Sequence, residues 1–294
     1  MPELPDVVIY VEHLANRIIG QRLEHVRLLN PFLLRTAEPP LSTADGLRVV
    51  DVRRMGKRIV VALEGELFLV LHLMIAGRLR WLERGVKPPG RITLGLLEFD
   101  TGTLAFTEAG TKRRASLHVV HGVAALASFD KSGIEPIDAD VSAFQLRLKR
   151  ENHTLKRALT DPQLFSGIGN AYSDEILHRA RLSPIALTQK LTLPEVERLH
   201  AATRAVLTEW TDRLCADAGT DFPRNVTAFR PEMAVHGKFG QPCPDCGAPV
   251  QRIVYAENET NYCARCQTGG TVLADRAMSR LLKSSWPRSI DELG

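Results

Sequence analysis

The first six residues, Met1-Pro2-Glu3-Leu4-Pro5-Asp6, carry the groups best suited to covalent chemistry. Because Pro2 is small, we expect Met1 to be removed, which leaves the secondary amine of Pro2 as the amino terminus. An α-amine has an unperturbed pKa of about 7.7–8.0, so much of it is uncharged near neutral pH. A secondary amine that condenses with an aldehyde-like carbon forms a positively charged iminium, and the adjacent Glu3 can transfer protons. The alternative is an amino terminus whose prolines merely stiffen a disordered start.

A cysteine cluster near the end of the chain has metal-ligand spacing. Cys243-Pro-Asp-Cys246 and Cys263-Ala-Arg-Cys266 are separated by sixteen residues. Two such pairs at this distance are typical of tetrahedral zinc, with a hairpin between them. Four protein ligands leave no open coordination position, so we predict one structural Zn²⁺. The alternative is four unligated core cysteines. Cys215 stands apart in a predicted helix, where we expect an ordinary buried residue.

A glycine-rich loop lies between two predicted helices and contains Gly167, Gly169 and Asn170. Glycines permit close backbone approach, and the N–H groups at a helix start bind anions, so a phosphate can dock here. The alternative role for Asn170 is that of a helix cap. No strand precedes this loop and no third glycine follows, which excludes a dinucleotide-binding motif.

The elements that must position these residues change in character along the chain. Helical spacing over residues 7–19 ends at Gly20, and short apolar runs predict strands at 58–63, 67–71 and 92–97. From about residue 133 the pattern is helical. We predict helices at 141–150, 154–160, 171–180 and 193–215, the last after the start signal in residues 192–195. Residues 260–262 read as the returning strand of the cysteine hairpin, and 274–283 as a docked helix or a loose tail.

Composition and charge bound the class of protein. The 294 residues are 44% hydrophobic and 24% charged, as in a soluble globular protein. No apolar run approaches the roughly 18 residues of a membrane span, and no secretory signal is present, so we expect a cytoplasmic protein. The net charge is +4, and basic residues cluster in a way that favours a polyanionic partner, although solvated charged faces are the alternative. The clusters comprise residues 53–58, residues 112–114, and Arg147, Lys149, Arg150, Lys156 and Arg157.

Taken together, the motifs resemble the Fpg/Nei family of bifunctional DNA glycosylases over roughly residues 1–268. The start Pro2-Glu3-Leu4-Pro5 is similar to the formamidopyrimidine-DNA glycosylase branch more than to the Nei branch. Gly56-Lys57-Arg58 before a strand resembles the β-hairpin lysine of the family, and residues 72–79 resemble its His-Leu-x-Met-x-Gly segment. Residues 167–175 resemble its helix-two-turn-helix signature, and the four-cysteine module resembles its zinc finger.

The resemblance implies an α+β fold in four parts. These are an N-terminal β-sandwich domain with a leading helix (1–132), a helical helix-two-turn-helix domain (133–240), a Cys₄ zinc finger (241–268) and a C-terminal extension (269–294). It also implies damaged DNA as the partner, one structural Zn²⁺, no small-molecule cofactor, no membrane association, a monomeric state, and a cytoplasmic, nucleoid-associated location.

The resemblance further implies roles for single residues. Pro2 would attack C1′ of the damaged nucleotide, Glu3 would transfer protons at the sugar, and Lys57 would contact the flanking phosphate and assist catalysis. Lys156 and Asn170 would hold backbone phosphates. The target base would be flipped out of the stack, because its glycosidic carbon is unreachable in the duplex. After base loss, β- and then δ-elimination would nick the strand.

Several DNA-facing positions are ambiguous or depart from the family pattern. His72 fits either a strand end that faces DNA or a buried, hydrogen-bonded histidine. Asn258, between two glutamates, stands where the family carries an arginine at the zinc-hairpin tip, so this contact lacks its charge. Ile75 stands at the void-filling methionine position, and the loop around Arg113 lacks the wedge phenylalanine. The loop at 219–231 is short and altered relative to one expected to cover an oxidised base.

These observations favour a base-excision-repair DNA glycosylase with AP-lyase activity on oxidised or otherwise damaged bases. The alternative is a DNA-binding member of the family with reduced or lost glycosylase activity that recognises abasic or damaged DNA. The joint presence of Pro2, Glu3 and Lys57 argues against that alternative, because binding needs none of them. A generic zinc-ribbon interaction protein would leave the amino-terminal motif unexplained.

Overall fold

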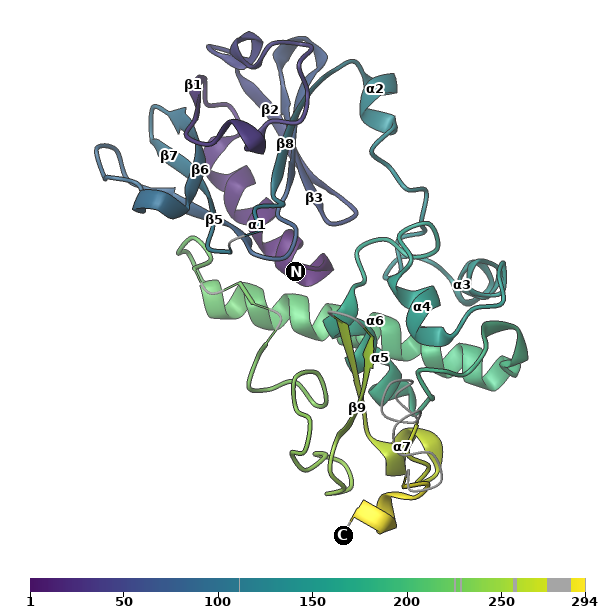
Figure 1. The fold of residues 1–294 in the computed structure, drawn as a ribbon. Coiled ribbons are helices and arrows are strands. Elements are labelled where there is room, and N and C mark those ends of the chain that lie inside the picture. Colours follow the sequence, from purple (N-terminus) through teal and green to yellow (C-terminus); the bar gives the residue numbers. More distant parts are fainter. Residues whose placement is uncertain (111, 225, 228, 256–257, 274–286, 294) are drawn as a thin grey trace. The chain divides into compact units, whose positions relative to one another are not determined.

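The computed structural model describes residues 1–294 apart from residues 111, 225, 228, 256–257, 274–286 and 294 (Figure 1). The chain folds into two compact units, residues 1–131 with 210–228 and residues 132–209 with 229–294. Each unit has an apolar core of its own. The predicted four-part division at residues 132, 240 and 268 stays a prediction.

Two four-stranded antiparallel sheets dominate the first unit, and they lie face to face (Figure 1). One sheet has the order β1-β6-β7-β5, with strands Leu23–Leu28, Thr93–Phe99, Gly102–Glu108 and Gly77–Leu82. The other has the order β2-β3-β4-β8, with strands Val49–Met55, Arg58–Leu63, Leu67–His72 and Ser116–His121. Buried side chains of both sheets form one core, which makes this unit a β-sandwich.

Helix α1 (Leu4–Ile18) belongs to the same core. Its apolar residues Val7, Tyr10, Leu14 and Ile18 recur at helical spacing and are fully buried with the strands. The helix packs against β2 and β3. The position of α1, and therefore of the amino terminus, is fixed by this burial.

Strands β3 and β4 read as continuous apolar runs because both of their faces are covered. On the face away from the main core, Val60, Ala62, Phe68 and Val70 form a second cluster. Leu126 of the short helix α2 (Val123–Ala127) joins this cluster, so alternation of polar and apolar residues is not required in these strands.

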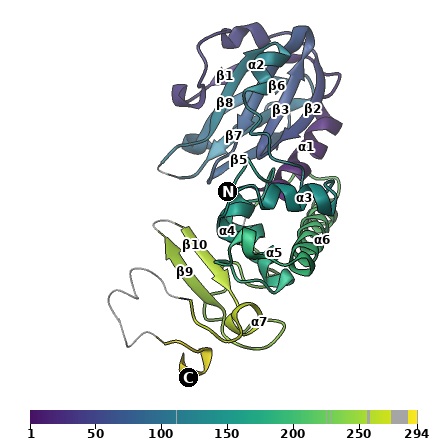
Figure 2. The same cartoon turned by 90° about the vertical axis from the view of Figure 1, so that its right-hand side faces the viewer.

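The second unit contains helices α3 (Val141–Leu148), α4 (Leu155–Thr160) and α5 (Asn170–Ala180), with the hairpin β9 (Gln251–Tyr255) and β10 (Asn258–Tyr262) and helix α7 (Ala264–Thr268). Helix α5 contacts α4, β10 and α7 (Figure 2). Helix α6 (Leu193–Ala218) contributes residues to both units. Single 3₁₀ turns occur at Pro31–Leu33, Leu41–Ala44, Glu64–Glu66, Gly90–Ile92, Thr188–Lys190 and Ile290–Leu293.

Most predicted elements are confirmed, with shifted ends. The strands at 58–63 and 67–71 are present, and the strand predicted at 92–97 runs from Thr93 to Phe99. Helix α1 begins at Leu4 rather than residue 7, because Pro5 fits the first helical turn and the Asp6 carboxylate accepts the N–H of Glu3. Helix α6 extends to Ala218, three residues beyond the predicted end. The helix predicted at 274–283 lies outside the described residues.

The segment after α6 is anchored to α1 within the first unit. The Phe222 ring lies 5.7 Å from that of Tyr10, and the Arg17 guanidinium lies 5.5 Å above it. Arg17 also donates a hydrogen bond to the Thr220 carbonyl at 2.7 Å. Phe222 and Val226 are both buried in the sandwich core. The altered loop at 219–231 is therefore held at its first half by apolar packing.

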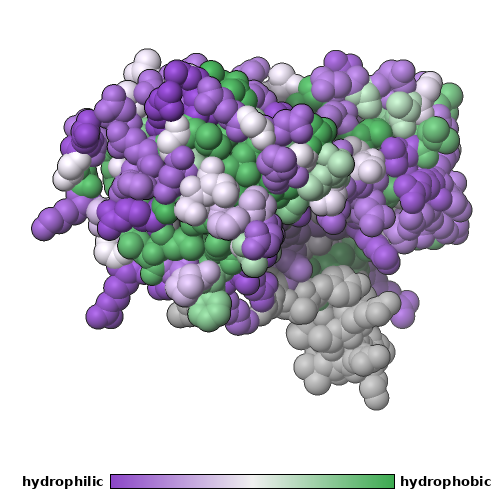
Figure 3. Space-filling model, turned by 90° about the horizontal axis from the view of Figure 1, so that it is seen from above, coloured by the Kyte–Doolittle hydropathy of each residue, from purple (hydrophilic) through white to green (hydrophobic). Residues whose placement is uncertain are grey.

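The surface in Figure 3 is predominantly hydrophilic, and apolar side chains gather in smaller groups between the polar ones. Among the described residues, no helix combines the length and apolar character needed to cross a membrane.

Candidate active site and metal centre

The start of α1 places the two residues proposed for covalent chemistry. Pro2 is buried, and Glu3 is the N-cap residue of α1 with only 2% of its surface exposed. The Glu3 N–H donates to the buried Asp6 carboxylate at 3.0 Å, and the Glu3 carbonyl accepts the N–H of Val7 at 2.9 Å. The backbone at Pro2 and Glu3 is therefore ordered by the first turn of a helix whose apolar face lies in the core.

Charged side chains surround the amino terminus. The amino group in the structure belongs to Met1, and burial lowers its pKa below the ordinary 8.0. The positive charges of Arg78 and Lys57 lower this pKa further, whereas the carboxylates of Glu3 and Asp6 raise it. The charges of Glu3 and Lys57 thus both act on the terminal amine of Met1, and the catalytic roles that the resemblance implies for Pro2, Glu3 and Lys57 stay predictions. Arg78 received no role from the sequence, and only its position in the fold reveals its effect on the amine.

Lys57 and His72 are neighbours at one end of the second sheet. Lys57 follows Gly56, whose positive φ of 59° makes the turn between β2 and β3, and Arg58 pairs with His72 across β3 and β4. His72 is partly buried; burial, Arg58 and Lys57 lower its pKa to about 4, so its ring is neutral at pH 7. Its ring has no hydrogen-bond partner within the described ranges, which argues against a satisfied core histidine.

Ile75 protrudes from the turn between β4 and β5. Its side chain is 53% exposed, and the preceding Met74 has a positive φ of 52°. The turn closes through the N–H of Gly77 on the Leu73 carbonyl at 2.9 Å. A Cβ at position 77 would lie 2.2 Å from that carbonyl oxygen, so only glycine fits there. An exposed apolar side chain is thus presented on a tightly constrained turn.

Arg113 lies in the loop between β7 and β8, and its guanidinium donates to the Arg91 carbonyl at 3.0 Å. The buried carboxylate of Glu108 accepts the N–H groups of Arg114 and Ala115 at 3.1 and 3.2 Å. Glu108 therefore anchors this basic loop, a role that the sequence did not indicate.

Asn170 does not cap α5. Gly169 is the N-cap residue, Asn170 is the first helical residue, and its side-chain amide donates to the Glu259 carbonyl of β10 at 2.8 Å. The helix-cap interpretation is therefore wrong. The amide of Asn170 ties the start of α5 to the zinc hairpin.

Lys156 belongs to a buried polar network. Its ammonium donates to the Asn170 carbonyl at 2.6 Å and to the Asp174 carboxylate. Asp174 is fully buried and also lies 2.8 Å from Nδ1 of His236. Only 14% of the Lys156 side chain is exposed. Within the fold, its ammonium neutralises the buried carboxylate of Asp174.

Glu175 holds the segment that leads into the cysteine module. Its carboxylate accepts the backbone N–H groups of Ala234, Val235 and His236 at 2.8, 2.9 and 2.9 Å. Three such donors stabilise a buried carboxylate without a cation. The sequence placed Glu175 within a signature but assigned it no role, because its partners lie far along the chain.

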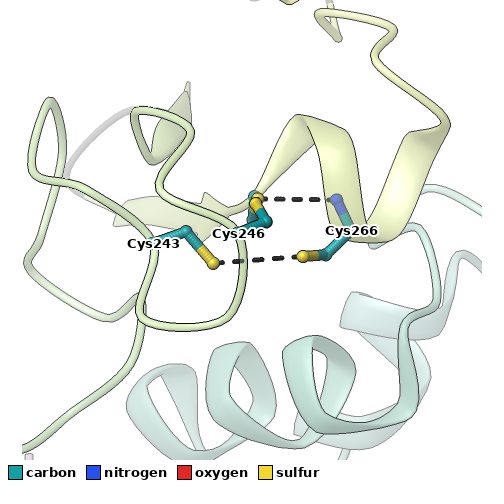
Figure 4. Close-up of side chains that lie close together, drawn as sticks. Cys243, Cys246 and Cys266 are labelled. Atoms are coloured by element: carbon teal, nitrogen blue, oxygen red, sulfur yellow. Dashed lines mark hydrogen bonds between the residues drawn. The ribbon is translucent and has the colours of Figure 1, made fainter.

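The four predicted zinc ligands converge, and Figure 4 labels three of them, Cys243, Cys246 and Cys266. Cys243 and Cys246 approach from a loop and Cys266 from α7, and the four sulfur atoms lie within 4.8 Å of one another. The Sγ–Sγ distances are 4.0 Å for Cys243–Cys266 and 3.4 Å for Cys246–Cys263. Zinc–sulfur bonds of about 2.3 Å in a tetrahedron require sulfur separations of about 3.8 Å. The cluster fits one tetrahedral Zn²⁺ held by cysteines alone.

Asn258 is exposed at the start of β10, as a hairpin-tip position requires. The neighbouring Glu259 carboxylate pairs with Arg252 at 3.2 Å and accepts the Asn261 amide at 2.6 Å. Its charge is therefore partly neutralised within the hairpin, while Glu257 lies outside the described residues.

Cys215 is partly exposed rather than buried, and its thiol lies 3.1 Å from Glu12.

Comparison with known proteins gives matches along nearly the whole chain. Residues 1–115 match the formamidopyrimidine-DNA glycosylase N-terminal domain, 133–213 its H2TH domain, and 240–269 the zinc finger found in FPG and IleRS. The formamidopyrimidine-DNA glycosylase of Solibacter usitatus is 31% identical over 91% of this chain and 99% of its own length. That of Thermus thermophilus is 35% identical over 92% of this chain and 100% of its own.

Solved structures agree with these matches. The MutM (Fpg) protein from Thermus thermophilus superposes with a TM-score of 0.76 at 33% identity, over 90% of this chain and 98% of that one. The LlFpg protein in complex with a THF-DNA and an inhibitor gives a TM-score of 0.81 at 25% identity, over 91% and 100%. The predicted α+β fold, with its sandwich, helix-two-turn-helix and zinc-finger parts, is confirmed. The chain belongs to the formamidopyrimidine-DNA glycosylase family.

Proposed function

We propose that this protein is a DNA glycosylase with AP-lyase activity, which excises oxidised or otherwise damaged bases through an iminium on Pro2. The observation that carries the proposal is the buried Pro2 directly before α1, with the buried Glu3 beside it and with Arg78 and Lys57 close enough to lower the pKa of the neighbouring terminal amine of Met1. A lowered pKa leaves more of the amine unprotonated and nucleophilic at neutral pH. Solved complexes of the Lactococcus lactis relative contain DNA with an abasic site and with an oxidised pyrimidine.

In the proposed reaction the Pro2 nitrogen donates its electron pair to C1′ of the damaged nucleotide. The glycosidic bond breaks, the base leaves with the bonding pair and takes up a proton, and the Pro2 nitrogen loses its N–H proton. Glu3 supplies the proton that the sugar ring oxygen needs when the ring opens to the iminium. The iminium then withdraws electrons from C2′, whose proton is lost as the 3′ phosphate departs. Loss of the 5′ phosphate follows, and hydrolysis frees Pro2.

For the first unit we propose four contacts with DNA. Lys57 binds the phosphate beside the lesion, and the neutral His72 next to it offers a hydrogen bond at the same strand end. Ile75 fills the space that the flipped base leaves, since its exposed side chain stands on a constrained turn. Arg113 adds charge from the loop that Glu108 anchors.

For the second unit we propose Lys156, Asn170 and Asn258 as contacts with the DNA backbone. An ammonium has three N–H groups, and partners among the described residues engage two of those on Lys156, so we propose that the third binds a phosphate. The Asn170 amide likewise keeps one N–H beyond its bond to Glu259. Asn258 offers a neutral hydrogen-bond donor at the hairpin.

We propose that Cys243, Cys246, Cys263 and Cys266 hold one structural Zn²⁺, which fixes the hairpin that presents Asn258. Zinc in such a site stabilises the fold of its module and takes no part in bond breaking. The monomeric state, the absence of a small-molecule cofactor and a cytoplasmic, nucleoid-associated location stay predictions.

The covalent step is tested by borohydride trapping on an abasic-site oligonucleotide. We expect the wild-type protein to form a trapped complex and the Pro2→Gly variant to lose it, because the secondary amine is gone. Pro5→Gly is the matched control, since it alters the same segment without changing the nucleophile. Wild-type protein that is not trapped, yet binds the DNA, would favour the non-catalytic alternative.

The pH dependence of nicking tests the surroundings of the amine. Only the unprotonated amine attacks, so the rate should rise with pH and level off above the pKa of the Pro2 amine. Burial lowers the pKa of the Met1 amine, the amino terminus in the structure, below the ordinary 8.0, and we expect the same direction for the amine pKa at Pro2. Arg78→Gln removes a positive charge that lowers this pKa, so the rise of the nicking rate should move to higher pH. Arg80→Gln changes an exposed position of the same strand and should leave the pH range of this rise unchanged. If the nicking rate of Arg78→Gln rises over the same pH range as that of the wild type, or at lower pH, the effect assigned to Arg78 on the amine pKa is contradicted.

The neutral hairpin contact is tested by Asn258→Arg. If Asn258 faces a phosphate, the new charge should tighten binding at low salt and steepen the slope of log affinity against log salt by about 1. Asn152→Arg adds the same charge at another exposed position of the second unit and corrects for the change in net charge. Equal effects of the two variants would show that the hairpin tip does not approach the DNA.

A further inference from the structure

His178 lies against the cysteine cluster although it belongs to helix α5. Its Nε2 atom is 3.3 Å from Sγ of Cys243, and the two residues are 4% and 2% exposed. The nearest carboxylate oxygen, on Asp245, lies 4.0 Å from the same nitrogen, which is beyond hydrogen-bond reach. The sulfur of Cys243 is therefore the acceptor that faces the buried imidazole.

Zinc bound by four thiolates makes a centre with two positive and four negative charges. Such a centre is stabilised by N–H donors that point at its sulfur atoms, because each donor offsets part of the excess negative charge. The Cys263 sulfur already accepts the N–H of Cys266 at 3.5 Å. His178 can supply a donor to Cys243 when Nε2 carries the proton.

Two other residues on the same face of α5 as His178 make contacts with the C-terminal part of this unit. Asn170, Asp174 and His178 are spaced four residues apart and so share one face of the helix. Asn170 bonds to the Glu259 carbonyl of β10, and Asp174 bonds to His236 just before the cysteine module. His178 completes this row with a contact to a metal ligand. One helix face thus contacts the zinc module at two positions and the segment that leads into it at a third.

We propose that His178 is a positioning residue that donates a hydrogen bond from Nε2 to the zinc-bound thiolate of Cys243, and so couples zinc retention to helix α5. The competing arrangement is a mixed site in which His178 itself is a ligand with Asp245 and Cys266, whose donor atoms also lie close together. The four cysteines fill a tetrahedron by themselves, so the structure favours a hydrogen bond over ligation. This hydrogen bond rests on the proposed zinc site and does not depend on glycosylase activity.

The test compares zinc release from the full-length protein in excess chelator that absorbs when it binds zinc. His178→Phe keeps a ring but removes the donor, and we expect zinc release about tenfold faster, since loss of such a partner typically costs 10–100-fold in metal affinity. His178→Gln restores an N–H donor and should recover most of the slow release. His200→Phe is the matched control, because His200 is also buried in this unit but bonds to the Ala139 carbonyl.

A second readout is the sulfur-to-cobalt absorption of the Co²⁺-substituted protein. Loss of the hydrogen bond in His178→Phe should shift this band to longer wavelength, and His178→Met checks that the result does not depend on the fit of one ring. Wild-type release rates and spectra in both donor-free variants would overturn the proposal. So would His178→Gln behaving like His178→Phe. A cobalt spectrum that loses one ligand would establish ligation by His178 instead.

Discussion

The burial of helix α1 in the sandwich core is the constraint on which the proposed chemistry depends. A free chain end is ordinarily mobile, and an exposed amine near neutral pH is largely protonated. Here the apolar face of α1 is fully enclosed, so its first turn, with Pro2 and Glu3, cannot move independently. Burial lowers the pKa of the terminal amine of Met1; the Glu3 carboxylate raises this pKa, and Arg78 and Lys57 lower it. The same packing that stabilises the unit therefore orders the backbone that carries the proposed nucleophile.

In the second unit helix α5 has a comparable organising role. Asp174 and Glu175 are buried carboxylates, and each is compensated by partners from distant segments. Removal of one partner from such a buried pair costs about 3–5 kcal/mol, whereas an exposed pair such as Arg179–Glu209 contributes about 0–1 kcal/mol. The energetically important contacts of α5 are thus those that reach Lys156, the segment at 234–236 and the zinc module. They hold the residues of this unit that are proposed to meet DNA in one arrangement.

Local patterns in the sequence predicted the features that depend on short spacing. The convergence of the four cysteines was predicted from two Cys-x-x-Cys pairs, and the strands at 58–63 and 67–71 were predicted from apolar runs bounded by turns. Features that depend on distant partners were missed. Arg78 acts on an amine more than seventy residues away, and the carboxylate of Glu175 binds N–H groups near residue 235. The helix-cap alternative for Asn170 is wrong for the same reason, because the partner of its side-chain amide lies on β10.

The proposed chemistry requires that the nitrogen of Pro2 form the covalent bond to DNA, and peptide mapping of the borohydride-reduced conjugate locates that bond. After digestion of protein and DNA, mass spectrometry identifies the peptide and the group that carry the sugar remnant. We predict that the remnant is carried by the amino-terminal peptide that begins at Pro2, with Met1 absent. A remnant on the side chain of Lys57, or a conjugate in which Met1 is retained, would contradict this assignment.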